Sequence, residues 1–190
     1  MGVALSASSL RQFSEYLDLL NLWNRSINLT AISDEKDILE KHFADSLSVI
    51  RHLPPDLESL VDVGSGAGFP GAVLALLLPH LPITLVEASH KKAAFLSTLR
   101  RELGLSRVTV LAARIEEVLA QGSRFPFHGA ISRATFPLPS WLALGRRLVR
   151  SPGGIILGME GSSEMPLPSE ATRHPVALPA GRRAIIVLRT

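Results

Sequence analysis

An α/β fold with a mostly parallel sheet and helices on both faces is the fold class that the sequence predicts. From residue 56 onward, short apolar segments alternate with segments of helical periodicity, and a glycine-rich turn follows the first apolar segment. Residues 1–55 show helical periodicity alone, so we expect an N-terminal helical extension packed on a main domain of residues 56–190. The chain of 190 residues is long enough for this single structural unit.

The helical extension is expected to contain two helical segments. The first should end near Asn24–Asn28, because apolar residues recur at helical spacing up to that point. The second should begin with Ser33 as its N-cap, since two acidic residues follow, and it should run to Leu53 and stop at a pair of prolines. The apolar residues of the first segment are Leu10, Phe13, Leu17, Leu20 and Trp23.

The main domain is expected to alternate between strands and helices, which is the pattern of a parallel sheet covered on both faces. The tail differs, since residues 166–179 are proline-rich and poorly periodic, and a last apolar strand at Ala184–Leu188 should pair antiparallel at the end of the sheet. The other expected strands are Leu60–Val63, Ile83–Val86, Val108–Leu111, Gly129–Ser132 and Gly154–Leu157, and the expected helices are Phe69–Leu78, His90–Leu103, Ile115–Leu119 and Pro139–Val149.

Composition excludes several classes of protein. The absence of cysteine rules out disulfides, thiolate metal sites and a cysteine nucleophile, and it fits a reducing cytoplasm. No apolar run approaches the ~18 residues of a membrane helix, and the first residues lack the basic start and apolar stretch of a signal peptide. The six histidines are scattered, so we expect no metal site. We therefore expect a cytoplasmic protein that does not span a membrane.

Charge is spread unevenly, although the net charge is only +3. Residues 1–60 hold five Lys/Arg against nine Asp/Glu, residues 61–120 hold six against five, and residues 121–190 hold nine against three. All nine cations of the last third are arginine, a side chain whose geometry suits phosphate oxygens. Two explanations stay open: a nucleic-acid partner, or a solvated face in a protein whose composition favours arginine.

The glycine-rich turn, Val61-Asp-Val-Gly-Ser-Gly-Ala-Gly-Phe-Pro-Gly71, can be divided in two ways. Its last three glycines match the dinucleotide fingerprint G-x-G-x-x-G, but that pattern starts two residues late relative to the strand. Asp62 would repel a pyrophosphate, and Pro70 removes an N–H group from the first turn of the next helix. A dinucleotide is therefore disfavoured, and a NAD-dependent oxidoreductase is only an alternative.

A cationic adenosine ligand without phosphate, S-adenosylmethionine, fits this turn better. Asp62 can hold its ammonium group, directly or through water, and the glycines let the backbone approach the methionyl part. Glu87 closes the second strand, where an acidic residue usually binds ribose hydroxyls. The alternatives are that Asp62 braces the loop and that Glu87 is an ordinary charge at a strand end. This pattern specifies the methyl donor and says nothing about the acceptor.

Five segments together resemble one family. They are Trp23-Asn-Arg-Ser-Ile-Asn-Leu-Thr30, Lys41-His-Phe-Ala-Asp-Ser46, Asp62-Val-Gly-Ser-Gly-Ala-Gly-Phe-Pro-Gly71, Lys91-Lys-Ala-Ala-Phe-Leu96 and Ile131-Ser-Arg-Ala134. Their order and spacing resemble the RsmG family, also called glucose-inhibited division protein B, whose members methylate N7 of a guanine in small-subunit (16S) ribosomal RNA. The resemblance implies a Rossmann-like class I S-adenosylmethionine-dependent methyltransferase fold, with ribosomal RNA or the small ribosomal subunit as partner. Nothing in the sequence suggests an obligate dimer, so we expect a monomer.

The resemblance also implies roles for individual residues. Arg133, at the end of the fourth strand, is the candidate catalytic residue and should face the guanine or the carboxylate of the cofactor. Without the resemblance it could equally be a partner in a surface salt bridge, while His42 and Asp45 could serve only in helix packing and capping. The cofactor-binding residues that the resemblance implies are Asp62, Gly64, Gly66, Gly68, Phe69, Glu87, Ala88, Arg114, Ile115, Glu116 and Arg133.

The implied chemistry needs no general base. Guanine N7 carries an unshared electron pair and no hydrogen, so catalysis rests on placement and on the positive charge left on the purine. One departure from the family concerns the acceptor side, where Glu160 occupies a position that usually carries lysine. We expect Glu160 to point away and an arginine such as Arg173 or Arg182 to supply the cation, while Arg146 and Arg147 meet phosphates. A weaker RNA binder, another acceptor, or a non-catalytic RNA or ribosome-assembly binder are the alternatives.

Overall fold

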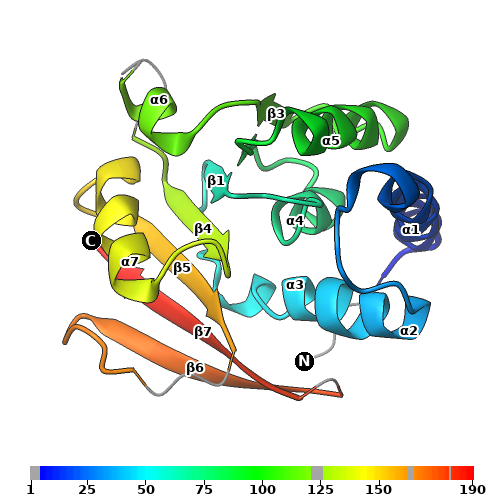
Figure 1. Ribbon diagram of the computed structural model, residues 1–190. Helices are drawn as coiled ribbons and strands as arrows, with labels where there is room; N and C mark the ends of the chain where they lie inside the picture. Colours follow the sequence, from blue (N-terminus) through cyan, green and yellow to red (C-terminus); the bar gives the residue numbers. More distant parts are fainter. Residues whose placement is uncertain (1–4, 121–125, 162–164, 180) are drawn as a thin grey trace.

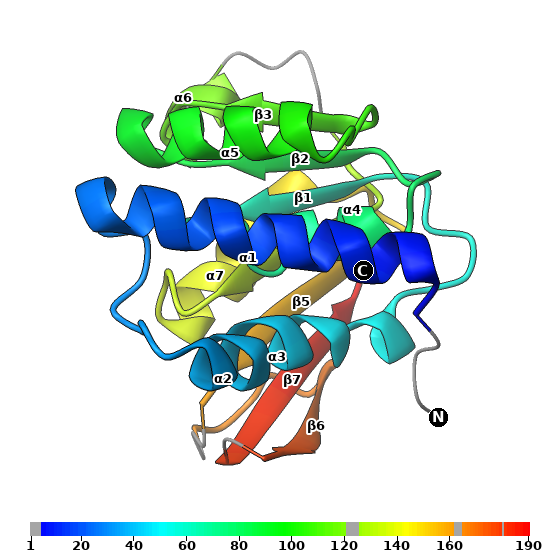
Figure 2. The same ribbon diagram turned by 90° about the vertical axis from the view of Figure 1, so that its right-hand side faces the viewer.

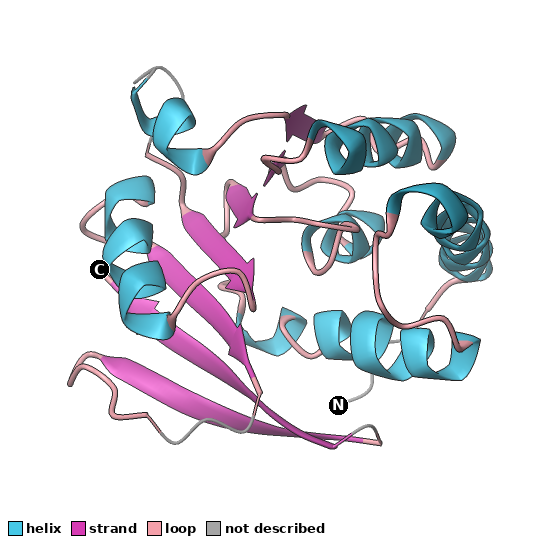
Figure 3. Cartoon of the chain, viewed as in Figure 1, coloured by secondary structure: helices cyan, strands magenta, loops and turns pink. Residues whose placement is uncertain are grey.

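The computed structural model describes residues 5–120, 126–161, 165–179 and 181–190, which form one seven-stranded sheet between two layers of helices (Figures 1 and 3). The strand order is β3-β2-β1-β4-β5-β7-β6. β1 to β5 are parallel, whereas β7 runs antiparallel to both β5 and β6. The strands are β1 (Leu60–Val63), β2 (Ile83–Val86), β3 (Val108–Leu111), β4 (Gly129–Arg133), β5 (Ile155–Glu160), β6 (Ala171–Leu178) and β7 (Gly181–Arg189).

Each face of the sheet has its own apolar layer. α4 (Gly71–Leu77) and α5 (His90–Glu102) cover one face, and α1 (Ala7–Ile27) lies outside them, as Figures 1 and 2 show. α6 (Ile115–Ala120) and α7 (Leu138–Leu148) cover the other. The parallel strands read as continuous apolar runs because both faces are buried. The α/β prediction, with parallel strands and an antiparallel C-terminal strand, is therefore confirmed.

The helical extension follows the predicted outline, with one error at a helix start. After α1 come α2 (Glu35–Ile38), the π-helical segment η1 (Leu39–Ala44), α3 (Asp45–Leu47) and the 3₁₀ turn η2 (Ile50–His52). Asp34, not Ser33, is the N-cap of α2, and its Oδ1 accepts a hydrogen bond of 2.9 Å from the backbone N–H of Asp37. The prediction of Ser33 was wrong because the two neighbouring residues are both good caps, and sequence alone does not choose between them.

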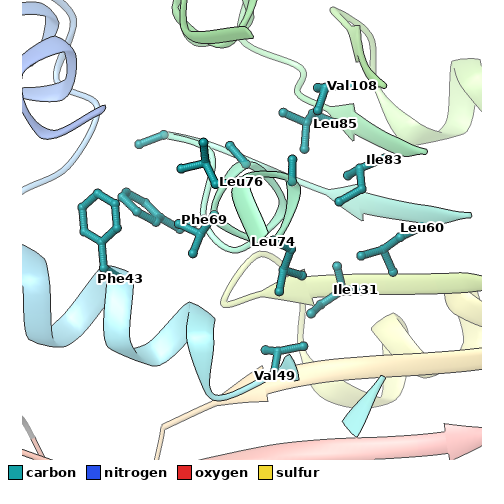
Figure 4. Packing of buried hydrophobic residues seen from close by; sticks show 14 of the residues in the cluster. Phe43, Val49, Leu60, Phe69, Leu74, Leu76, Ile83, Leu85, Val108 and Ile131 are labelled. Carbon is teal, nitrogen blue, oxygen red and sulfur yellow. The ribbon is translucent and has the colours of Figure 1, made fainter. Parts of the chain in front are cut away.

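Extension and sheet share one hydrophobic core. Phe43 from the helical extension packs against Phe69, and Val49 lies beside Leu74 of α4, which in turn faces Leu60 of the sheet (Figure 4). Leu74 is fully buried between the two parts of the chain. Among the described residues, no helix combines the length and the apolarity needed to cross a bilayer.

The tail contains a strand that the sequence did not predict. β6 pairs only with β7 and forms the edge of the sheet, so the missing N–H of Pro175 costs no ladder hydrogen bond. Val176 is the one fully buried residue of β6, which explains why its apolar periodicity was too weak to recognise. β7 therefore lies between β5 and β6 rather than at the edge, although its antiparallel pairing with β5 agrees with the prediction.

Replacement of Leu74 by alanine should lower the free energy of unfolding by about 2–5 kcal/mol, because it opens a cavity where the extension meets the sheet. Urea unfolding followed by circular dichroism measures the loss. The matched control is Leu22→Ala on the outer side of α1, where the side chain is 58% exposed and the change should stay within about 0.5 kcal/mol. Equal losses for the two variants would contradict the shared core.

Candidate functional site

The candidate site lies at the carboxyl ends of the parallel strands. The register pairs Val63 with Val86 and Asp62 with Ile131, so the segments that follow β1, β2 and β4 emerge at the same edge of the sheet. The glycine loop follows β1 there. Gly64 has φ +73° and Gly68 φ +94°, a left-handed conformation that favours glycine. Side chains from three separate strand ends therefore meet around one loop.

A buried tyrosine from the helical extension holds the glycine loop in place. Tyr16 of α1 donates a hydrogen bond of 2.6 Å from its hydroxyl to the carbonyl oxygen of Ala67. Its ring stacks on Phe69, with ring centroids 5.3 Å apart. A Cβ atom at Gly68 would collide with the Tyr16 hydroxyl, so this glycine is required for close packing as well as for its conformation. The extension is thus part of the site's construction.

The first pocket of the site opens beside the glycine loop and has a volume of about 370 Å³. Seven of the predicted cofactor-binding residues line it, namely Gly64, Gly66, Glu87, Ala88, Arg114, Ile115 and Glu116. It also takes in residues that the sequence analysis missed, which are Val63, Val86, Lys92, Ala113, Thr135 and Phe136. Lys92 lies within the Lys91–Leu96 segment, and Thr135 directly follows the Ile131–Ala134 segment. Both segments carry the family resemblance, so they could have indicated these two residues. We call this the donor pocket.

Glu87 lines the donor pocket and also organises its rim. One carboxylate oxygen accepts a hydrogen bond of 2.8 Å from the backbone N–H of Gly66, and the other accepts one of 2.8 Å from Ser89. A carboxylate oxygen has two lone pairs, so both oxygens keep the capacity to accept a further hydroxyl. The side chain is therefore more than an ordinary charge at a strand end.

Asp62 does not line the donor pocket and lies fully buried beneath the loop. Its Oδ2 accepts a hydrogen bond of 3.0 Å from the backbone N–H of Gly71, which braces the start of α4. Its Oδ1 has no hydrogen-bond partner among the described residues. Burial raises the pKa of Asp62 to about 7, although the Gly71 hydrogen bond opposes this shift. One oxygen is thus a brace, as one of the two sequence interpretations held, and the other is enclosed beneath the loop, out of direct reach of a ligand in the donor pocket.

Arg133, Gly68 and Phe69 also lie outside the donor pocket. Arg133 lines a second pocket of about 270 Å³, on the other side of the β4 end, which we call the arginine pocket. Its Nη1 donates to the carbonyl oxygen of Lys41 (3.1 Å) and to Asp45 Oδ2 (3.3 Å). Its guanidinium also lies over the ring of Phe69, 5.3 Å from the centroid. Arg133 is therefore a half-buried anchor between sheet and extension, not a surface salt-bridge partner.

His42 connects Arg133 to the extension as a neutral imidazole. Arg133 Nη2 lies 3.2 Å from His42 Nδ1, and His42 Nε2 lies 2.8 Å from the hydroxyl oxygen of Thr30. Burial, with the Arg133 charge as second cause, lowers the pKa of His42 to about 4. Since arginine only donates, His42 Nδ1 must accept, and Nε2–H then donates to Thr30. Asn24 fixes Thr30 in turn, through two hydrogen bonds of 3.0 Å to its backbone.

Asp45 completes this cluster as a carboxylate held by Arg133. Desolvation raises the pKa of Asp45, and the neighbouring Arg133 charge partly offsets that shift. The side chain is almost entirely buried, so its contact with Arg133 compensates for the cost of placing a charge there. The segments Trp23–Thr30 and Lys41–Ser46 thus come together around one arginine of β4.

Glu160 faces the site, and the expectation that it points away was wrong. It lines the arginine pocket together with Arg183, and its Oε2 lies 3.5 Å from Arg173 Nη2. Arg173 thus pairs with Glu160 and does not supply the cation expected in place of the family's lysine. The guanidinium that lines the pocket belongs to Arg183, not to Arg182. The sequence could not show this because β6, which carries Arg173, was not recognised as a strand.

Arg146 and Arg147 lie away from the site. They belong to the last turn of α7, and Leu148 accepts a hydrogen bond of 2.9 Å from Phe127, just before β4 begins. This end of α7 is therefore at the opposite edge of the sheet from the pockets. Arg146 also forms an ion pair with Glu170. The prediction that these two arginines meet phosphates at the site is not supported by their position.

The fold and the donor pocket define a class I methyltransferase. The chain matches an O-methyltransferase from Bacillus cereus in complex with SAH at a TM-score of 0.65 and 16% identity, covering 99% of this chain and 93% of that one. Cofactor-bound Rv0187 from MTB gives a TM-score of 0.67 at 16% identity, covering 94% and 89%. At these identities the likeness shows the fold alone, and it confirms the predicted class. In the described parts of the chain, no cluster of three His, Cys, Asp or Glu residues could hold a metal ion.

The chain belongs to the family described as rRNA small subunit methyltransferase G, whose sequence profile matches residues 9–175. Relatives named ribosomal RNA small subunit methyltransferase G include that of Halorhodospira halophila, 43% identical over 161 residues (85% of this chain, 74% of the relative). The relative from Syntrophus aciditrophicus is 41% identical over 165 residues (85% and 67%), and that from Pseudomonas entomophila 36% over 197 residues (100% and 90%). The family resemblance of the sequence is thus confirmed.

Replacement of Asp62 by asparagine should change how stability depends on pH. The folded-state pKa of about 7 lies above the ordinary value of 3.8, so the folded protein binds a proton that the unfolded chain releases between these values. The wild type should therefore lose stability relative to Asp62→Asn as pH rises from 5 to 7, by about 2–3 kcal/mol at 1.4 kcal/mol per pH unit. Above pH 7 the difference should level off.

Urea unfolding of both proteins without ligand, at half-unit steps from pH 5 to 8, measures this difference. The exposed Asp56 provides a matched control, since Asp56→Asn should follow the wild-type profile. A difference between wild type and Asp62→Asn that is constant across the range would show that Asp62 is ionised throughout.

Proposed function

We propose that this protein transfers a methyl group from S-adenosylmethionine to N7 of a guanine in the 16S RNA of the small ribosomal subunit. The observation that carries the proposal is the family match, because residues 9–175 include both pockets except for Arg183. The structure adds a donor pocket beside a second, arginine-lined pocket at the same sheet edge. An oxidoreductase using the glycine loop has no comparable support.

The residues of the donor pocket fit S-adenosylmethionine. The pocket volume of about 370 Å³ falls within the range of small-molecule sites. We propose that Glu87 accepts the ribose hydroxyls, that Arg114, Ile115 and Glu116 border the adenine, and that Gly64 and Gly66 contact the methionyl part. Asp62, which is buried beneath the loop and does not line the pocket, supports the cofactor site by bracing the loop through the N–H of Gly71. When bound there, S-adenosylmethionine supplies an electrophilic methyl group.

The groups beside the arginine pocket suit a nucleophile that loses no proton. His42 is neutral, with both ring nitrogens engaged, and the Asp45 carboxylate is held by Arg133. Neither is free to act as a general base, and guanine N7 requires none. We propose that Arg133, which keeps further N–H donors, orients either the target base through O6 or the carboxylate of the cofactor. Three groups of the extension anchor Arg133, which would keep the orientation of its guanidinium fixed.

The proposed partner is ribosomal RNA within the small subunit. The tip of the β6–β7 hairpin lies at the site edge, since Glu160 pairs with Ala184, and Arg182 and Arg183 precede that residue. Neither arginine forms an ion pair within the described part of the chain, so both can meet phosphate oxygens. We further propose that the protein acts as a cytoplasmic monomer and as a single structural unit, with residues 1–55 serving as an integral part of the site.

The test of the proposed activity uses small subunits from cells that lack the modification. Purified protein and S-adenosylmethionine should methylate these subunits, and cleavage chemistry specific for 7-methylguanine should locate one modified position in the 16S RNA. A methyl group on another atom, or none, would contradict the proposal and favour another acceptor or a non-catalytic binder.

Replacement of Glu87 by glutamine should weaken S-adenosylhomocysteine binding by about 1–3 kcal/mol, because one acceptor oxygen is replaced by an amide donor. Isothermal titration measures the change. Glu102→Gln, on the exposed surface of α5, is the matched control and should bind like the wild type. NADH should give no measurable heat with any of these proteins. Tight NADH binding without affinity for S-adenosylhomocysteine would support a dinucleotide enzyme instead.

Removal of Arg182 and Arg183 should weaken binding of the small subunit and flatten its salt dependence. Each phosphate contact that is lost should reduce the slope of log K against log salt by about 1. The double variant Arg146→Ala/Arg147→Ala, at the opposite sheet edge, is the control and should keep the wild-type slope. If the control loses slope while the hairpin variant does not, RNA binds to the far edge of the molecule.

A further inference from the structure

A third pocket at the site edge lies next to both pockets described above. It has a volume of about 260 Å³ and shares Phe136 with the donor pocket, and Ala134, Met159, Glu160 and Gly161 with the arginine pocket. Its walls are mainly apolar, with Phe136, Pro137, Trp141 and Met165 among them. The Phe136 and Trp141 rings stack at 6.0 Å with an interplanar angle of 14°. We call this the apolar pocket.

Glu160 is the charged side chain that borders this apolar pocket. It is the last residue of β5, and its side chain is only 15% exposed. Its Oε2 contacts Arg173, which also donates a 2.8 Å hydrogen bond to the carbonyl oxygen of Met165. Its Oε1 has no hydrogen bond within the described part of the chain, and Glu160 lines both pockets. A half-buried carboxylate held by one oxygen thus has its other oxygen available to a ligand.

A guanine base offers the complement of such a site. Enzymes that act on a base withdrawn from its stack read the Watson–Crick edge by hydrogen bonds and hold the ring between aromatic and apolar side chains. Guanine carries two adjacent donors on that edge, N1–H and N2–H, whereas adenine presents an acceptor at N1. A carboxylate accepts two parallel hydrogen bonds, so it selects guanine. N7 lies on a different edge of the base, the Hoogsteen edge, so contacts at N1 and N2 leave it free to face the donor pocket.

We propose that Glu160 is a specificity-determining residue, whose carboxylate accepts hydrogen bonds from N1–H and N2–H of the target guanine while the base lies in the apolar pocket. This inference rests on the proposed function. The Glu160 carboxylate would also stabilise the purine increasingly as methyl transfer proceeds. Methyl transfer to N7 leaves a positive charge on the purine, which strengthens N1–H and N2–H as donors to an anion. Glu160 therefore affects kcat as well as KM.

The surrounding charges support this role over a contact with phosphate. A carboxylate repels phosphate, and Arg173 is already engaged with Glu160. Arg183 lines the arginine pocket and forms no ion pair among the described residues, so it can hold a phosphate that flanks the target base. In this arrangement Glu160 binds the target base, and Arg183 binds the phosphate backbone of the RNA.

The experiment compares small subunits reconstituted with 16S RNA that carries either guanine or inosine at the methylated position. Inosine lacks the 2-amino group but keeps N7, O6 and N1–H. Wild-type kcat/KM should be about tenfold lower on inosine, as expected for loss of one hydrogen bond to a charged group. Glu160→Gln should lower kcat/KM on guanine about tenfold or more, with part of the loss in kcat, and should lower the guanine-to-inosine ratio to about 1–2.

Arg173→Gln is the matched control, because it removes the ion pair but leaves the carboxylate. It should retain the tenfold preference for guanine, and the melting temperatures of both variants show whether they fold. If Glu160→Gln and Arg173→Gln lose activity alike while the ratio stays at the wild-type value, Glu160 is only a structural ion-pair partner and the proposal is overturned. An increase in activity on guanine in Glu160→Lys would also overturn it, since that would indicate a phosphate contact. A wild-type enzyme that methylates neither substrate overturns the proposed function, and this inference with it.

Discussion

The hydroxyl of Tyr16 donates a 2.6 Å hydrogen bond to the carbonyl oxygen of Ala67, and the geometry of the donor pocket depends on this contact. The glycine loop has few side chains of its own, so it must be held by groups from elsewhere. Tyr16 holds it from α1, and Asp62 holds its far end through the N–H of Gly71. Both polar groups are buried, where an unmatched hydrogen bond is costly, so the loop has little freedom to move away from them.

The same extension also fixes the arginine pocket. Arg133 is bound by the carbonyl oxygen of Lys41, by Asp45 and by His42, all from one helical segment. The buried carboxylate of Asp45 needs the half-buried guanidinium in turn, because an unpaired charge in a low-dielectric interior is strongly destabilising. The result is that residues 1–55 do not merely cover the sheet. They determine the direction of a loop after β1 and of a side chain at the end of β4, on two sides of one site.

The edge of the sheet presents a carboxylate in two places, Glu87 directly after β2 and Glu160 at the end of β5 beside Arg183. The donor pocket balances two acidic against two basic side chains, whereas the arginines of the β6–β7 hairpin suit the phosphates of an RNA. Glu160 is a carboxylate and cannot serve as a phosphate contact. Recognition of the target base therefore explains its position better. Because the pockets share residues, a base placed in one can reach a methyl group held in the next.

The sequence by itself determined the alternation of strands and helices, the glycine loop and the family, since these are encoded in local spacing and residue type. Strand-end position also predicted Glu87, and the family resemblance predicted Arg114–Glu116; the structure places both along one pocket. Only the tertiary structure decided that Asp62 braces Gly71, that Arg133 lies in a separate pocket, and that Glu160 pairs with Arg173. These contacts join segments far apart in the chain, and β6, an exposed edge strand with little apolar periodicity, gave no local signal of its position.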